Sequence, residues 1–251
     1  MQRYFLQLAY KGTNYHGWQI QDNAPTIQAE INKALSILLN QTIETIGCGR
    51  TDTGVHASDY YAHFDCLEIK DIPQLIYKLN KFLSQDIAVY KILKVKNDAN
   101  ARFDAIERTY NYYITKRKDP FLTESAYYYY GNLNVIEMNK ASEILLTYKD
   151  FEAFSKSNTQ VNNYICHISY AKWTEKNELL NFEITANRFL RNMVRAIVGT
   201  LLEVGKGNMN LEDFKKVIES KNRSNAGFSV PAHALFLSNI KYPQTIFNVE
   251  S

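Results

Sequence analysis

The chain has 251 residues, and 45% of them are hydrophobic, so it can bury one large core or two smaller ones. Its 29 basic and 26 acidic side chains leave a formal net charge of only +3, so overall charge makes no case for a nucleic-acid partner. Three scattered cysteines exclude a disulfide framework and a zinc knuckle, and no apolar run approaches the ~20 residues that cross a bilayer. We therefore expect a cytoplasmic protein with no membrane contact and no metal site.

The first half of the chain alternates strand and helix patterns. Apolar runs predict strands at residues 4–10, 43–46, 60–66 and 86–95. Apolar residues at helical spacing predict a helix capped by Thr26 and a second that begins at Ile72. The order strand, helix, strand, strand, helix, strand is ferredoxin-like, with helices on one face of the sheet.

A glycine-rich stretch at residues 47–57 joins the second and third of these strands. Its glycines permit backbone angles that other residues disfavour, and loops on a rigid sheet are common sites of function. Asp52 is therefore our candidate chemical centre, and Arg50 can project on the same side if the loop is extended. The alternative is that Asp52 caps a turn and Arg50 makes a local hydrogen bond.

Residues 11–19, after the first strand, are rich in glycine and polar groups and predict a loop beside a site. Further along, a strand at residues 108–114 places Tyr110 and Tyr112 on one face, so either tyrosine is a candidate for substrate contact. The basic run at residues 116–120 ends this strand and marks the region between two domains.

We place these domains at residues 1–105 and 106–251. The second repeats the coarse order of the first, so the predicted fold is α+β, with two ferredoxin-like halves, each a mainly antiparallel sheet with helices packed on one face. Its expected elements are a helix over residues 138–148, a hairpin of residues 164–173 and 179–186 that turns around residues 175–177, a short helix from Leu211 and a last strand at residues 234–242.

Between that hairpin and the short helix, a broad apolar stripe from Leu190 predicts a buried helix with Gly205 as its C-cap. Arg191 and Arg195 are expected one turn apart on it. Since a buried charge is costly unless it is paired, this helix needs anionic partners. A structural salt bridge is the alternative to a functional role.

Residues 49–57 (GRTDTGVHA) resemble the active-site signature of the tRNA pseudouridine synthase A family. Residues 10–19 are similar to the amino-terminal motif of this family, and residues 186–199 (ANRFLRNMVRAIVG) resemble its arginine-bearing helix motif. The resemblance implies that Asp52 is the catalytic residue and that Arg195 pairs with it. It also implies that Tyr110, and not Tyr112, is the active-site tyrosine.

The resemblance further implies a homodimer that isomerises uridine to pseudouridine at positions 38 to 40 of the tRNA anticodon stem-loop, without a cofactor. The active-site cleft is expected between the two halves, with Tyr110 stacking on the target base and Leu235 as an apolar wall. Arg50 is expected to fill the space of the displaced uridine or to hold a phosphate. The family usually has Gly-Leu-Tyr-Leu where this chain has Ala234 and Phe236 around Leu235.

Three other classes of protein share single features with this sequence. An aspartic protease also carries Asp-Thr-Gly but needs two such aspartates, and this chain has the tripeptide once. A base deaminase needs His-x-Glu and Pro-Cys-x-x-Cys zinc ligands, which the sequence lacks. A tRNA-binding module without catalysis would bind the same partner and leave uridine unchanged, so an assay must separate it.

Overall fold

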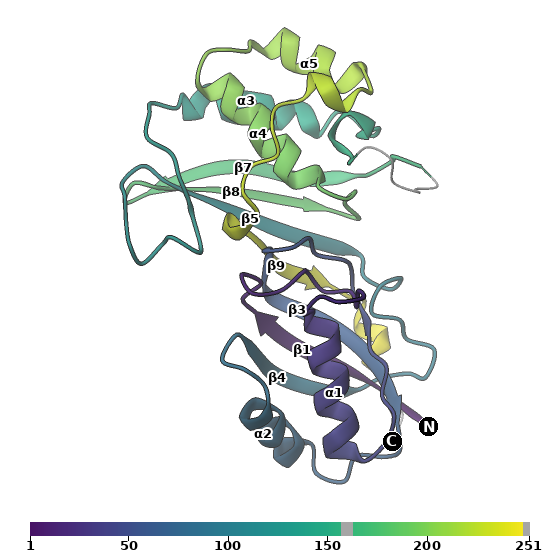
Figure 1. Ribbon diagram of the computed structural model, residues 1–251. Coiled ribbons are helices and arrows are strands. Elements are labelled where there is room, and N and C mark those ends of the chain that lie inside the picture. Colours follow the sequence, from purple (N-terminus) through teal and green to yellow (C-terminus); the bar gives the residue numbers. More distant parts are fainter. Residues whose placement is uncertain (157–162, 248–251) are drawn as a thin grey trace. The chain divides into compact units, whose positions relative to one another are not determined.

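The computed structural model describes residues 1–156 and 163–247 (Figure 1). The chain forms two compact units, of which the first is Met1–Ile106 with Leu237–Ser251 and the second is Glu107–Phe236. Both combine helices with a mostly antiparallel sheet, which confirms the predicted α+β class. In the described part of the chain, no helix is long and apolar enough to cross a membrane.

The first unit contains the predicted order of strands and helices. Its elements are β1 (Gln2–Tyr10), α1 (Ile27–Leu39), β2 (Ile46–Gly47), β3 (His56–Cys66), α2 (Ile72–Phe82), β4 (Ile87–Lys94) and, from Leu237 on, β9 (Leu235–Lys241). Strand β1 pairs antiparallel with β3 on one side and with β4 on the other, and both β2 and β9 border β3. Helices α1 and α2 contact each other and lie on the same side of this sheet (Figure 1).

Both faces of β1 are buried. Tyr4, Leu6 and Leu8 are at most 1% exposed on the face towards the helices, where Tyr4 stacks on Phe64 of β3 at 5.8 Å between ring centroids. Phe5 points to the opposite face and is covered by two aromatic rings of the C-terminal segment, Tyr242 at 5.3 Å and Phe247 at 6.1 Å. The C-terminal residues therefore complete the first core.

The helix starts of the first unit follow from local capping. Thr26 Oγ1 accepts a hydrogen bond from the Ala29 N–H at 3.4 Å, as predicted, and Asp71 Oδ1 accepts one from the Gln74 N–H at 2.9 Å. Such side-chain acceptors satisfy N–H groups that have no partner within the helix.

The strand expected at residues 43–46 is shorter than predicted, because only Ile46 and Gly47 pair with β3. The preceding backbone bonds to side chains of α1 instead. Ser36 Oγ accepts from the N–H of Ile43 at 2.9 Å, and Asn32 Oδ1 accepts from the N–H of Thr45 at 3.0 Å. Side-chain acceptors therefore replace the sheet ladder over these residues.

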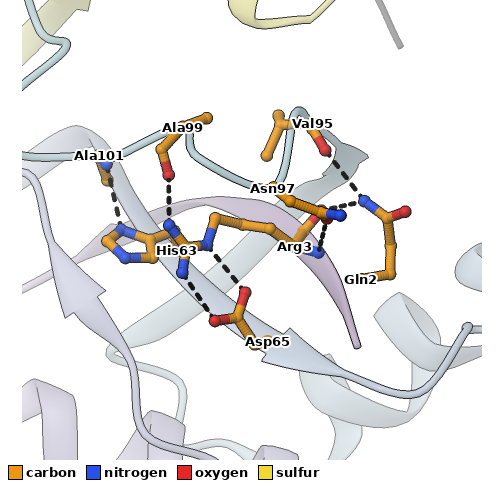
Figure 2. Close-up of polar contacts among 8 residues, drawn as sticks. All are labelled: Gln2, Arg3, His63, Asp65, Val95, Asn97, Ala99 and Ala101. Atoms are coloured by element: carbon orange, nitrogen blue, oxygen red, sulfur yellow. Dashed lines mark hydrogen bonds and ion pairs between the residues drawn. The ribbon is translucent and has the colours of Figure 1, made fainter. Parts of the chain in front are cut away.

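A polar cluster fastens residues 95–101 to the first sheet (Figure 2). Arg3 donates from Nε and Nη2 to the two carboxylate oxygens of Asp65 at 2.8 and 2.7 Å, and from Nη1 to the carbonyl oxygen of Ala99 at 3.0 Å. The N–H of Ala101 donates to Nδ1 of His63 at 3.1 Å, so this imidazole is a buried acceptor. The guanidinium and the imidazole thus hold the same segment at two points.

The second unit contains β5 (Glu107–Thr115), β6 (Tyr127–Tyr128), α3 (Val135–Leu145), β7 (Ile168–Lys176), β8 (Leu179–Ala186), α4 (Met193–Gly205) and α5 (Leu211–Glu219). Strand β8 lies between β5 and β7 and is antiparallel to both, whereas the short β6 runs parallel to β5. Helices α3, α4 and α5 contact one another and form a layer on one side of this sheet (Figure 1).

Three details of the second half differ from the sequence expectations. The hairpin turns at Asn177 and Glu178, both with positive φ (51° and 63°), and not around residues 175–177. Helix α4 ends one residue later than predicted, with Lys206 as the C-cap. Residues 237–251 belong to the first unit, although we placed them in the second domain, because β9 pairs with β3.

The expected pair of arginines on the buried helix is also wrong. Asn192 adopts a left-handed conformation (φ 66°) and is the N-cap of α4, so Arg191 precedes the helix and is exposed. Arg195 alone lies within α4, on a helix that is otherwise buried over most of its length.

Candidate active site

The loop from β2 to β3 presents Asp52 on a tight turn. The N–H of Val55 donates to the carbonyl oxygen of Asp52 at 3.1 Å, and Gly54 has φ +78°, a conformation that favours glycine. Asp52 is a partly exposed residue, whereas Thr51 directly before it and Val55 at the end of the turn are buried. Two buried residues therefore anchor the loop in the first unit, with the partly exposed Asp52 between them.

Residues 12–17 bind along one side of this loop, which supports their interpretation as a segment beside a site. The N–H of Gly54 donates to the carbonyl oxygen of Tyr15 at 3.3 Å, and the N–H of Gly12 donates to Nδ1 of the buried His56 at 2.9 Å. Since Nδ1 is an acceptor, the neutral imidazole of His56 carries its proton on Nε2.

Two glycines permit this close approach. A Cβ atom on Gly12 would lie 2.0 Å from the carbonyl oxygen of Val55, and one on Gly17 would lie 2.1 Å from the carbonyl oxygen of Thr51. Gly17 also has φ +81°. The backbone of the segment and the backbone of the loop thus touch directly, with no room for side chains between them.

Aromatic residues of the first unit pack against the start of this loop. Trp18 is 3% exposed and stacks on Tyr60 of β3 at 4.2 Å between ring centroids, so it is a packing residue. The hydroxyl of Tyr60 donates to the carbonyl oxygen of Gly49 at 2.5 Å. A Cβ atom on Gly47 would lie 2.1 Å from that hydroxyl oxygen, so glycine is required where the loop begins.

Arg50 lies on the same loop and is exposed. Within residues 1–156 and 163–247, its guanidinium makes no hydrogen bond or ion pair, so the alternative of a local hydrogen bond has no support there. An exposed guanidinium two residues from Asp52 is available for a phosphate or a base.

In the second unit, the two candidate tyrosines of β5 have different environments. Tyr112 is fully buried, its hydroxyl donates to the carbonyl oxygen of Pro231 at 3.0 Å, and burial raises its pKa well above the usual value. Tyr110 is partly exposed, and its ring contacts Phe189 edge-on at 5.1 Å and 88°. Tyr112 is therefore a core residue, which leaves Tyr110 as the candidate.

Arg195 is fixed at its Nε atom, which donates to the carbonyl oxygen of Val230 at 2.7 Å. This bond orients the guanidinium without neutralising its charge. Leu235, the first residue of β9, is 5% exposed, and the ring of Phe236 beside it packs edge-on against Tyr113 at 5.4 Å.

The extended segment of residues 226–231, which we did not single out from the sequence, runs along α4. Thr200 Oγ1 accepts from the N–H of Gly227 at 2.8 Å, and a Cβ atom on Gly199 would lie 1.8 Å from the carbonyl oxygen of Phe228. The Ser229 hydroxyl accepts from Arg223 at 2.8 Å. The only sequence signal for this segment is its glycine and proline, which are typical of an irregular, extended backbone.

No candidate metal site is found within the described residues, where no group of three or more His, Cys, Asp or Glu side chains is placed to hold a metal ion. The three cysteines are buried and form no disulfide bond. The candidate chemistry therefore rests on Asp52 and Arg50 in the first unit and on Tyr110, Arg195 and Leu235 in the second.

The chain is similar in sequence to a known protein family and to several curated proteins. Residues 141–243 match the family model described as tRNA pseudouridine synthase. Over its full length, the chain is 53% identical to a tRNA pseudouridine synthase A of Bacteroides thetaiotaomicron, 94% of which is covered. It is 52% identical to one of Parabacteroides distasonis, with both chains fully covered. A Francisella tularensis relative of the same name is 38% identical over 98% of this chain and 96% of its own.

Proposed function

Because the chain belongs to the tRNA pseudouridine synthase A family, we propose that it isomerises uridine to pseudouridine at positions 38 to 40 of the tRNA anticodon stem-loop. The observation that carries the proposal is the loop of Asp52, where this partly exposed residue lies between the buried Thr51 and Val55. A catalytic group needs this combination of access and fixed position.

The reaction breaks the N1–C1′ bond of uridine, turns the base and joins C5 to C1′, after which the proton on C5 moves to a nitrogen of the ring. No atom is gained or lost and there is no net oxidation, so the rearrangement needs no redox cofactor. One ionised carboxylate can start this reaction by any of three alternative mechanisms. Asp52 attacks the uracil ring, or it attacks C1′, or it removes a proton from the sugar to start an elimination.

We assign supporting roles to four further residues. A uridine in a stem must leave its helix, at a cost of a few kcal/mol of unstacking. Arg50, exposed beside Asp52, fills the space of the displaced base or holds a phosphate. Tyr110 stacks on the base or transfers a proton, Leu235 provides an apolar wall, and Arg195 supplies the cation that keeps Asp52 ionised.

Family membership also supports a homodimer that acts in the cytoplasm. Light scattering on the purified protein tests the homodimer, and a mass of one chain at micromolar concentration would contradict it.

For Arg50, the test is the salt dependence of tRNA binding, because each phosphate contact releases counterions. The variant Arg50→Ala should bind tRNA more weakly and with a shallower salt dependence, whereas an unchanged salt slope would argue against the phosphate role.

The decisive assay incubates the protein with an unmodified tRNA transcript. Pseudouridine has the mass of uridine, so the digest is separated by chromatography and the modified position is mapped with carbodiimide. The control transcript carries cytidine in place of each uridine at positions 38 to 40. We expect product from the first transcript and none from the second. Binding without any product would indicate a tRNA-binding module without catalysis. Product from both transcripts would show that the modified uridine lies outside positions 38 to 40.

A further inference from the structure

Thr51, the residue directly before Asp52, is bound through its side chain to the hydroxyl of Tyr10. The two oxygen atoms are 2.9 Å apart, and the residues are 8% and 4% exposed, so water does not substitute for this bond. Tyr10 ends β1 and lies opposite Ala57 of β3 in the sheet. The bond therefore ties the middle of the loop to the regular part of the first unit.

Tyr10 is itself held in place on two sides. Its ring packs edge-on against Tyr60 at 5.4 Å and lies 6.3 Å from the indole of Trp18. A tyrosine has few rotatable bonds, so a packed ring leaves the hydroxyl with little freedom to move. The oxygen that Thr51 meets is thus a fixed point of the core.

Asp52 lies between this bond and the turn that follows. On the far side, the N–H of Val55 donates to the Asp52 carbonyl oxygen at 3.1 Å. On the near side, the backbone of Gly17 limits the Thr51 carbonyl, and the Thr51 side chain is held by Tyr10. Removal of either hydroxyl would release the Thr51 side chain. The residue before Asp52 would then be held only by its backbone contact with Gly17, and the carboxylate could shift.

We propose that Tyr10 is a positioning residue, which sets the place of the Asp52 carboxylate through the Tyr10–Thr51 hydroxyl pair. This inference rests on the proposed catalytic role of Asp52. A displacement of about 1 Å at a reacting group can cost on the order of 100-fold in rate. Loss of this pair should therefore lower the rate of turnover much more than loss of a buried neutral hydrogen bond elsewhere in the fold.

The test compares Tyr10→Phe, Thr51→Val and the double variant with the wild type. Each single variant should lower the single-turnover rate at saturating tRNA by roughly 10- to 100-fold, with the dissociation constant for tRNA unchanged. The double variant should be no slower than the slower single variant, because both changes remove the same bond. Thr51→Ser keeps the hydroxyl and should restore the rate to within a few-fold of wild type.

Tyr4→Phe is the matched control. The hydroxyl of Tyr4, near the other end of β1, accepts a hydrogen bond from the N–H of Ile69 at 3.1 Å, and Tyr4 is as buried as Tyr10. Loss of the Tyr4 hydroxyl should lower thermal stability about as much as Tyr10→Phe does and leave the rate at wild-type level. Equal rates for Tyr10→Phe, Thr51→Val and Tyr4→Phe would overturn the inference, provided that Asp52→Asn is inactive. An active Asp52→Asn would instead remove the proposed function of that residue.

Discussion

Arg195 and Val230 exchange two hydrogen bonds in the second unit. Nε of Arg195 donates to the carbonyl oxygen of Val230 at 2.7 Å, and the N–H of Val230 donates to the carbonyl oxygen of Arg195 at 3.3 Å. The guanidinium is thereby oriented by a segment that is itself held along α4. Its position depends on residues 226–231 as well as on its own helix.

Arg195→Met should therefore reduce both turnover and stability. It removes the cation proposed for Asp52 and leaves the carbonyl oxygen of Val230, a fully buried residue, without this donor, at a cost of about 1–3 kcal/mol. Single-turnover rates across pH and urea unfolding measure the two effects. Full activity with an unchanged pH profile would rule out the proposed pairing with Asp52.

Arg223→Met is the matched control for that change. Arg223 donates to the carbonyl oxygen of Gly227 at 3.0 Å and to the hydroxyl of Ser229 at 2.8 Å, so it holds the same segment without supplying the proposed cation. We expect a comparable loss of stability with a much smaller loss of turnover. Equal losses of turnover would mean that Arg195 acts only by holding residues 226–231.

Tyr110→Phe should slow turnover by at least about tenfold if the hydroxyl transfers a proton, and it should leave tRNA affinity unchanged because the ring still stacks. Tyr112→Phe is the comparison on the same strand. Its hydroxyl bonds to Pro231 inside the second unit, so its loss should cost about 1 kcal/mol of stability and little turnover. A larger loss of turnover in Tyr112→Phe would show that the wrong tyrosine was chosen.

Gly17→Ala should displace the Asp52 loop and lower both stability and turnover. The added Cβ atom would lie 2.1 Å from the carbonyl oxygen of Thr51, and the backbone has φ +81°. Gly207→Ala separates the two causes, because Gly207 has φ +78° but nothing within 4 Å of an added Cβ atom. Both variants should lose about 1 kcal/mol from backbone strain, and only Gly17→Ala should lose turnover as well. A fully active Gly17→Ala would show that contact with residues 12–17 does not position the loop.

Acid should destabilise the first unit through His63 (Figure 2). Burial, together with the charge of Arg3, lowers the pKa of His63 to about 4, and the smaller opposing effects of Asp65 and Asp104 do not reverse this. Unfolded histidine titrates near pH 6.5. The unfolded chain therefore binds the proton first as pH falls. The stabilisation is complete above about pH 6.5 and is lost as pH falls towards about 4.

Urea unfolding at several pH values measures this loss, which we expect to be on the order of 2 kcal/mol between pH 6.5 and 4.5. His63→Gln keeps an acceptor for the N–H of Ala101 but cannot titrate. The variant should therefore lose less stability than the wild type between these pH values, and the difference should be on the order of 2 kcal/mol. An unchanged slope would show that other groups cause the acid sensitivity.

Local pattern was enough to predict most elements of the fold. The caps and helices at Thr26 and Ile72 and the alternation of β5 depend on neighbouring residues in the chain, so the sequence displays them directly. The pairing of β9 with β3 joins residues far apart in sequence, and no local period encodes it. The same reason explains why residues 237–251 were placed in the wrong half.

The candidate site was predictable to a similar degree. The glycine-rich run around Asp52 showed where the loop lies, and the structure adds why its glycines are needed. The arginine pair was misjudged because the positive φ of Asn192 starts α4 later than the apolar stripe suggests. Residues 226–231 were missed because an extended segment held by side chains has no periodic pattern. Strand periodicity left Tyr110 and Tyr112 as equal candidates, the family resemblance favoured Tyr110, and the burial of Tyr112 supports that choice.

The central claim is that Asp52 performs the chemistry, and pseudouridine formation by Asp52→Asn tests it most directly. Asparagine has the same size and caps turns nearly as well, but its amide is neither a useful base nor a comparable nucleophile. The measurement is the yield of pseudouridine in unmodified tRNA, with urea unfolding and tRNA affinity as controls for fold and binding. We predict no product from a folded variant that binds tRNA normally. Product at a near wild-type rate would contradict the assignment and leave Asp52 as a residue of the turn.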